Sequence, residues 1–180
     1  MIRGTKIYLR QMEESDMPYY YDMINDPDIC EKVVGWSFPV SLKEQNEWFE
    51  RSIKDGLNKR FTIVLKENNQ PVGMVTLTDI DWHNRSAFHG IKLHPSCPKG
   101  EGIGTDAVLT LMKYAFEEVN LNRLDGCWLS DNIASERLYL KCGWEVEGVK
   151  KNAIYRGGIY HDLKIVGITK EKYLKIINEK

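Results

Sequence analysis

The chain has 180 residues, of which 42% are hydrophobic, and this suits one domain of ordinary size over residues 1–180. Its formal net charge is −1, which excludes a broad basic surface for nucleic acid and a polybasic membrane anchor. No apolar stretch approaches the roughly 18 residues of a membrane span, and the first residues lack a signal-peptide core. We therefore expect a cytoplasmic protein that binds a small molecule or a peptide end, with no nucleic-acid or membrane partner.

The first half of the chain predicts one strand, two helices and then three strands. Residues 6–10 alternate as in a half-buried strand, and Ser15-Asp16 is typical of the N-cap of a helix that runs to about residue 25. A second helix begins at Ser41, where Glu44 completes a capping box. Runs rich in β-formers and separated by turn residues then predict three consecutive antiparallel strands, at 61–67, 72–78 and 86–93.

The second half predicts two helices and three strands. A glycine-rich loop leads into a helix whose apolar residues, from Ala107 to Val119, form one stripe. A strand at 124–129, a helix from Asn132 to Gly143, and strands at 144–150 and 160–169 follow, the last two joined by a long connection. The crossover from 86 to 128 makes two strands parallel. We expect an α+β fold with a mixed, mostly antiparallel sheet of about seven strands and four helices.

The glycine loop is an anion cradle. Gly100, Gly102 and Gly104 occupy every second position directly before the helix, so backbone N–H groups and the positive end of the helix dipole are open to a phosphate. A triphosphate loop is excluded because Gly104 is not followed by Lys-Ser or Lys-Thr. A dinucleotide fingerprint, with Asp125 as the ribose-binding acid, is an alternative, but five residues separate the loop from the preceding strand.

Cysteine and histidine spacing indicates neither disulfides nor a metal. The four cysteines include no Cys-x-x-Cys pair, so reduced and mostly buried thiols are expected. The histidines show no i, i+4 pairing of the kind that holds a metal on a helix. These residues are Cys30, Cys97, Cys127 and Cys142, and His83, His89, His94 and His161.

Two motifs together resemble the GNAT superfamily of acyl-CoA-dependent N-acyltransferases. The segment 99–104, Lys-Gly-Glu-Gly-Ile-Gly, is similar to the family's Gln/Arg-x-x-Gly-x-Gly/Ala loop. Asn132, Ser135, Tyr139, Gly143 and Trp144 match the family pattern Asn-x-x-Ala/Ser-x-x-x-Tyr-x-x-x-Gly-Phe. Segments 25–27, 80–85 and 158–162 further resemble the branch of ribosomal-protein N-terminal acetyltransferases, which has polyamine and antibiotic relatives. The resemblance implies acetyl-CoA as co-substrate, no metal, and a sheet that splays where the cofactor binds.

The resemblance also implies which residues bind coenzyme A. The pyrophosphate would lie on the glycine loop, and the pantetheine arm would pair with the end of the preceding strand. Asn132 caps its helix, with cofactor binding as a second possible role. The implied cofactor-binding residues are Ile91, Lys92, Leu93, Lys99, Gly100, Glu101, Gly102, Ile103, Gly104, Thr105 and Asn132.

Tyr139 is the predicted catalytic acid, because a phenol of pKa near 10 can protonate a leaving thiolate whose pKa resembles the roughly 8.5 of a cysteine thiol. The alternative is that Tyr139 is an aromatic residue of its helix that only packs on the sheet. Many relatives in this branch carry a Glu as base where this chain has Phe88. His89 is the predicted substitute if the extra residue before the loop makes a bulge that turns it into the cleft, and His161 and Asp162 are further candidates.

The missing carboxylate favours an acceptor amine of low pKa. Neutralising an amine of pKa about 10.4 at pH 7 costs roughly 4.6 kcal/mol, whereas a peptide α-amine of pKa about 7.7–8.0 costs about 1–1.4 kcal/mol. We therefore expect direct acetyl transfer to a peptide N-terminus or an amino sugar rather than to a polyamine, although Asp26, Asp28 and Glu31 are placed to receive a cationic substrate. The alternative is a non-catalytic acyl-CoA-binding regulatory module.

The sequence is compatible with a monomer or a homodimer. Three aromatic residues near the second predicted helix, Trp36, Phe38 and Trp48, are suited either to a substrate cleft or to a subunit contact.

Overall fold

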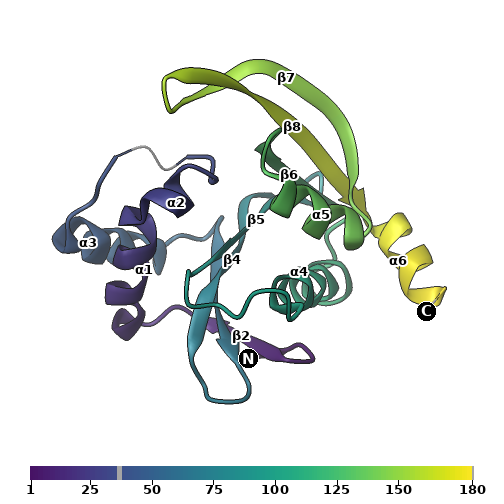
Figure 1. Cartoon of the computed structure of the whole chain (residues 1–180). Coiled ribbons are helices and arrows are strands. Elements are labelled where there is room, and N and C mark those ends of the chain that lie inside the picture. The colour runs from purple at the N-terminus through teal and green to yellow at the C-terminus, as the bar shows by residue number, and fades with distance from the viewer. Residues whose placement is uncertain (36–37, 180) are drawn as a thin grey trace.

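A computed structural model describes residues 1–35 and 38–179 and contains an eight-stranded sheet in the order β1-β2-β3-β4-β5-β6-β8-β7 (Figure 1). Strands β5 and β6 are parallel, as the crossover predicts, and all other neighbours are antiparallel. The strands are β1 (Ile2–Arg3), β2 (Ile7–Gln11), β3 (Lys59–Leu65), β4 (Pro71–Asp81), β5 (Ser86–Leu93), β6 (Arg123–Leu129), β7 (Glu145–Arg156) and β8 (Ile159–Thr169).

The helices cover both faces of this sheet. On one face α4 and α5 pack on the main core, and on the other α1 packs against α3. The buried residues of α4 recur at helical spacing, which explains how this helix buries one stripe on the sheet. The helices are η1 (Glu14–Asp16), α1 (Met17–Asn25), α2 (Pro27–Cys30), α3 (Leu42–Ser52), α4 (Ile103–Lys113), the π-turn η2 (Tyr114–Glu118), α5 (Ile133–Lys141) and α6 (Lys170–Asn178).

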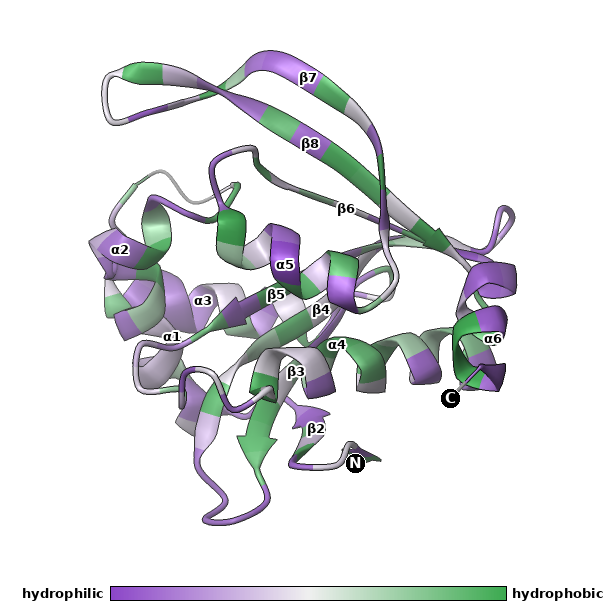
Figure 2. Ribbon diagram, turned by 45° about the vertical axis from the view of Figure 1, so that its right-hand side comes forward, coloured by the Kyte–Doolittle hydropathy of each residue, from purple (hydrophilic) through white to green (hydrophobic). Residues whose placement is uncertain are grey.

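Apolar burial is concentrated in the central strands. In Figure 2 β3 and β4 are mostly hydrophobic, whereas the turn that joins them is hydrophilic. All residues from Phe61 to Leu65 are buried, so both faces of β3 are covered by helices. Within the described ranges no helix is long and apolar enough to cross a membrane.

The sheet splays between β5 and β6. These strands pair only at Ser86 with Arg123, Ala87 with Leu124 and Phe88 with Asp125. Beyond this point β5 stays paired with β4 as far as Leu93, while β6 follows β8 to Leu129. The predicted splay is therefore confirmed: the last residues of β5 are paired with β4 on one side, and β6 no longer pairs with them on the other.

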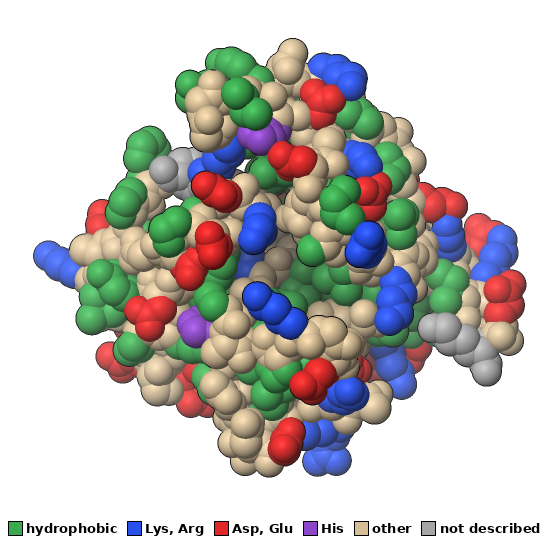
Figure 3. Space-filling model, viewed as in Figure 1, with side chains coloured by type: hydrophobic (Ala, Val, Ile, Leu, Met, Phe, Trp, Pro, Cys, Tyr) green, Lys and Arg blue, Asp and Glu red, His purple; other side chains and the backbone are tan. Residues whose placement is uncertain are grey.

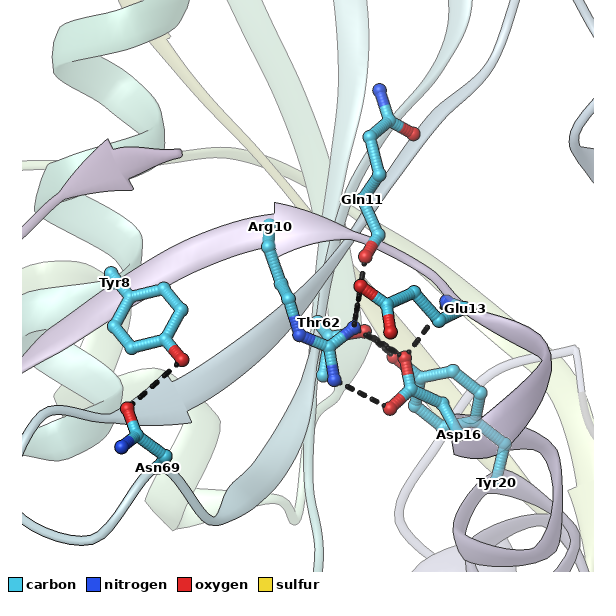
Figure 4. Close-up of polar contacts among 8 residues, drawn as sticks. All are labelled: Tyr8, Arg10, Gln11, Glu13, Asp16, Tyr20, Thr62 and Asn69. Carbon is cyan, nitrogen blue, oxygen red and sulfur yellow. Dashed lines mark hydrogen bonds and ion pairs between the residues drawn. The ribbon is translucent and has the colours of Figure 1, made fainter.

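A buried ion pair anchors α1 to the sheet (Figure 4). Arg10 on β2 donates two hydrogen bonds of 2.7 Å to the Asp16 carboxylate, and Thr62 on β3 donates a third of 2.8 Å. The hydroxyl groups of Tyr20 on α1 and Thr62 are 2.6 Å apart. Burial would raise the pKa of Asp16, but the bonds from Arg10, the Glu13 backbone and Thr62 outweigh it and lower the pKa.

Several elements differ from the prediction. The sheet has eight strands rather than about seven. β1 and α2 are additional because a two-residue strand and a four-residue helix are too short to show periodicity. The nine-residue α6, which directly follows β8, is also additional. The long connection expected before β8 is instead strand as far as Arg156. Its turn is only Gly157-Gly158, with φ of 54° and 84°, which two glycines adopt readily in a tight hairpin.

Candidate active site

The splay opens into a cavity of about 1150 Å³ that collects most of the predicted cofactor-binding residues. The cavity also extends to α2 and to the tip of the β7–β8 hairpin. Glu101 is the exception among the predicted residues: it does not line the cavity, and its carbonyl accepts a 2.7 Å hydrogen bond from Lys6. The residues brought together here are Ile91, Lys92, Leu93, Lys99, Gly100, Gly102, Ile103, Gly104, Thr105 and Asn132.

The glycine loop turns its backbone toward open space. Gly100 and Gly102 have φ of 78° and 80°, and a Cβ built on either would meet no atom within 4 Å. Gly102 is the N-cap of α4, so the first N–H groups of a helix face the cavity. Asp106, the one acid in the first turn, is turned away and accepts backbone hydrogen bonds from residues 5–7. The loop therefore suits a phosphate group.

Two cations that the sequence analysis missed add to this site. Arg137 and Lys141 lie one turn apart on α5 and line the cavity together with Lys99. Figure 3 shows a hollow in this face with Lys and Arg side chains around it. Their spacing of four residues on a helix that begins beside the cofactor motif is the signal that would have identified them.

The dinucleotide alternative has little support in this geometry. Asp125, its ribose-binding acid, does not line the cavity, and its carboxylate is held 2.7 Å from the Arg123 guanidinium at the closed end of the splay. A dinucleotide would need this acid at the open end of the strand.

Asn132 caps α5 as expected. Its side-chain oxygen accepts a 3.1 Å hydrogen bond from the Ser135 N–H. Its amide nitrogen donates to the Lys32 carbonyl at 3.1 Å. Asn132 therefore ties α5 to the segment after α2 at the border of the cavity, and cofactor binding by its side chain stays a prediction.

Tyr139 lies beside the point where β5 and β6 part. Its hydroxyl is 3.0 Å from Nδ1 of His89, and its ring stacks on Trp128 and meets Trp144 edge-on. The side chain is buried, and burial raises the pKa of the phenol. Neither Tyr139 nor His89 is among the residues that line the cavity. The packing role is thus present in the structure, and the catalytic role stays a prediction.

The bulge on which the base role of His89 depended is absent. β4 and β5 pair in one register from Gly73 with Leu93 to Thr78 with Phe88, so His89 points to the face opposite Phe88 and is only 1% exposed. Burial lowers the pKa of the imidazole to about 3. Its Nε2 atom is buried without a hydrogen-bond partner. The structure therefore places His89 in the core, where it contacts Tyr139, and offers no path from it to an acceptor on the Phe88 side.

The two other candidate bases, His161 and Asp162, are neighbours on β8 but have different surroundings. His161 lines the cavity, and its Nδ1 lies 2.7 Å from Asp131 Oδ2. Asp162 does not line the cavity and is bonded to Lys151 and to the Asn152 N–H. Of the predicted cation-binding acids, Asp26 caps α2, whereas Asp28 and Glu31 lie exposed at the cavity border.

A second cavity of about 650 Å³ lies on the other face of β5. Phe88 and Trp48 line it, together with residues of α1, α3, β3 and β4, and Lys92 contributes to the lining of both cavities. Phe38 is exposed and lines neither cavity, and Trp36 lies outside the described residues. The second cavity thus adjoins the larger one at the end of β5.

All four cysteines are free, and Cys97 and Cys142 are buried, whereas Cys30 and Cys127 are half-buried. Cys97 lines the larger cavity, and burial raises the pKa of its thiol to about 11, so the thiol is protonated at neutral pH. In the described part of the chain no group of three or more His, Cys, Asp or Glu side chains is placed to hold a metal ion.

Comparison with known proteins gives the family. Residues 6–145 match the model of the acetyltransferase (GNAT) domain. The chain is 26% identical over 171 residues to a spermidine N(1)-acetyltransferase of Vibrio cholerae, covering 95% of this chain and 97% of the relative. A putative ribosomal N-acetyltransferase of Bacillus subtilis, YdaF, is 34% identical but over only 101 residues, 56% of this chain and 55% of the relative. The narrower ribosomal-protein branch therefore stays a prediction.

Solved structures agree with this assignment. The crystal structure of spermidine N-acetyltransferase from Vibrio cholerae in complex with CoA and spermine has a TM-score of 0.87 and 26% sequence identity, and it covers 94% of this chain and 98% of that one. The family model covers most of the sequence, and the fold is shared over nearly its whole length. This chain therefore belongs to the GNAT family and is an N-acetyltransferase that uses acetyl-CoA.

Proposed function

We propose that this enzyme transfers the acetyl group directly to a primary amine of low pKa, with Tyr139 as the proton donor. Acetyl-CoA supplies the acetyl group as a thioester. The amine nitrogen bonds to the carbonyl carbon, the carbon–sulfur bond breaks, the thiolate receives a proton, and the amine proton passes to solvent. The single observation that carries the proposal is the splay that exposes the β5 backbone between two adjoining cavities, one for each substrate.

The cofactor half of the site is supported by the glycine loop. Its backbone N–H groups would hold the pyrophosphate, and Lys99, Arg137 and Lys141 would neutralise further phosphate charge. The edge of β5 at residues 91–93 that faces away from β4, where β6 has diverged, would hold the pantetheine arm as an added strand. An N–H there would also stabilise the thioester oxygen as negative charge develops during attack.

The acid role of Tyr139 is supported by its position and its protonation state. Its hydroxyl is 3.0 Å from Nδ1 of His89, which precedes the open edge of β5 at residues 91–93, and the raised pKa of the phenol keeps it protonated. If His89 carries its hydrogen on Nδ1, it donates to the Tyr139 oxygen, which leaves the phenol hydrogen free for the thiolate. His89 is then a positioning residue rather than the base.

A carboxylate base is absent from the Phe88 position, which favours an amine that is partly neutral at pH 7. The relatives named as spermidine acetyltransferases make a polyamine the competing acceptor. Polyamine amines resemble lysine in pKa, and the fraction that is neutral at pH 7 is lower by about two orders of magnitude than for a peptide α-amine. We therefore favour a peptide N-terminus or an amino sugar.

An acceptor panel tests this choice. In an assay of free-thiol release at pH 7, we expect a higher kcat/KM for a short peptide with a free N-terminus, or for D-glucosamine, than for spermidine. The difference should shrink as the pH rises toward 10, because the spermidine amines then lose their protons. Spermidine as the fastest acceptor over the whole pH range would overturn the choice of acceptor class while leaving acetyl transfer itself intact.

Gly102→Ala tests the cofactor half. A side chain at φ of 80° costs about 1–2 kcal/mol of unfolding free energy, and the added methyl group would occupy space that the loop leaves open to the phosphate. We expect KM for acetyl-CoA to rise about tenfold or more while KM for the acceptor changes little. Gly158→Ala is the matched control, because Gly158 also has a positive φ, 84°, and its Cβ also meets no atom within 4 Å, but it does not line the cavity. Equal KM values for Gly102→Ala and the wild type would contradict phosphate binding by this loop.

A further inference from the structure

The second cavity has an unusual floor for an enzyme that binds an amine. Residues of one strand face alternate sides, so Phe88, Gly90 and Lys92 of β5 point to the same side. In the sheet register Arg60 of β3, Thr76 of β4 and Gly90 of β5 form one row across three strands. Arg60 and Lys92 therefore both line the cavity, two strands apart.

Gly90 leaves space between these two cations. A Cβ at this position would lie only 3.0 Å from the Thr76 hydroxyl oxygen. The floor between Arg60 and Lys92 is thus formed by Thr76, the Gly90 backbone and Met74. A residue with a longer side chain in place of Gly90 would leave less room for a ligand group above this floor.

Arg60 is held in place but has unused hydrogen-bonding capacity. Its guanidinium lies 5.6 Å from the centre of the Trp48 ring and 3.6 Å from Asp55 Oδ2. This carboxylate already accepts hydrogen bonds from the Leu57 N–H and from Asn58. The Nη1 atom of Arg60 is the atom that faces Asp55, and at 3.6 Å it makes an ion pair with this carboxylate but no hydrogen bond.

Lys92 lies at the junction of the two cavities, close to where the amine must meet the thioester. Burial lowers the pKa of its amine to about 8, and the charge of Arg60 acts in the same direction. At neutral pH most molecules therefore still carry a protonated Lys92 amine. The inner part of the cavity therefore carries two positive charges.

The acidic side chains of this cavity lie on the outer helix and already have partners. Glu44 forms the capping box with Ser41, and Glu47 is 3.9 Å from Lys43. Arg51 on the same helix adds a further positive charge. The exposed acids Asp28 and Glu31 line the larger cavity, not this one.

We propose that the acceptor carries an anionic group, a carboxylate or a phosphate, which binds between Arg60 and Lys92 while its amine reaches the thioester at the end of β5. This inference rests on the acetyl transfer proposed above. Arginine and lysine bind such oxyanions through charge-assisted hydrogen bonds. The same charges disfavour a polycation, and they lower the pKa of an amine held nearby, which compensates in part for the missing carboxylate base.

Paired acceptors that differ only by an anionic group test the proposal. The probes are D-glucosamine against D-glucosamine 6-phosphate, and amidated tetrapeptides with Asn against Asp at the second position, with spermidine as the polycation. The wild type should prefer the anionic member of at least one pair by tenfold or more in kcat/KM. Arg60→Gln should remove most of that preference through a rise in acceptor KM, with the uncharged partner changed about twofold or less.

Arg60→Lys is the matched variant, because it keeps the positive charge and should retain most of the preference. KM for acetyl-CoA should be unchanged in both variants, which separates acceptor binding from a general loss of structure. Equal rates for both members of every pair, preference for spermidine, or a preference that survives Arg60→Gln would overturn the anionic-acceptor proposal. No acetylation of any amine would instead contradict the proposed function itself, so the two failures are distinguishable.

Discussion

Tyr139→Phe is expected to lower kcat by about 10²- to 10⁴-fold, the range that a positioned general acid contributes. The phenyl ring keeps the stacking on Trp128 and the edge contact with Trp144, so the fold and the cleft should persist. Only the proton donor and its bond to His89 are removed. The measurement is steady-state thiol release across pH with the best acceptor, together with the thermal unfolding midpoint.

Tyr173→Phe is the matched control for this result. Tyr173 is another buried tyrosine of the main core, and its hydroxyl bonds to Glu117 at 2.6 Å, away from both cavities. We expect it to affect stability but not kcat. If Tyr139→Phe retained wild-type turnover with acetyl-CoA still bound, the tyrosine would be a packing residue and the thiolate would take its proton from water.

Asp16→Asn is expected to reduce the free energy of unfolding by about 1.5–3 kcal/mol, because it removes the charge from the hydrogen bonds that the half-buried Arg10 makes to this side chain. The Asp16 side chain is only 3% exposed, and three hydrogen bonds from Arg10 and Thr62 converge on it. Loss of this anchor should loosen α1 against β2 and β3. Denaturant unfolding followed by tryptophan fluorescence measures the change.

The pH dependence of this effect has a definite sign. The folded-state pKa of Asp16 lies below its ordinary value, so the pair stabilises the protein above the unfolded pKa of about 3.9, and the contribution is lost as the pH falls through the folded value. The difference between wild type and Asp16→Asn should therefore be full at pH 7 and shrink in acid. Asp162→Asn, at a more exposed pair with Lys151, should change the free energy of unfolding far less. A cost for Asp16→Asn as small as that would contradict the anchor.

Elements with strong local signals were predicted well from the sequence. The capping box at Ser41 is present, Asn132 caps α5, and the glycine loop opens α4. The order of strands around the crossover is also confirmed, because a parallel pair joined by a helix follows from chain order and handedness. The hairpin connection was wrong because the register of β7 with β8 depends on tertiary pairing rather than on local composition.

The site could be predicted only as far as backbone geometry determines it. Most of the predicted cofactor-binding residues gather in one cavity because the loop, the strand end and the cap of α5 are fixed by the fold. The orientation of His89 depended on an assumed bulge, and the regular register of β5 places it in the core instead. The presence of Arg60 and Lys92 in one cavity was not predicted, since the two residues are distant in sequence and come together only through the pairing of three strands.

Direct acetyl transfer from acetyl-CoA to an amine is tested most directly in one reaction with two readouts. Free thiol is quantified, and the acceptor and the protein are both analysed by mass spectrometry. We predict one free thiol for each acetylated amine, with the protein unmodified throughout. Acetyl-CoA that binds without acetylating any amine would instead indicate a non-catalytic acyl-CoA-binding module. An acetyl group that appears first on the protein and then on the amine would contradict direct transfer.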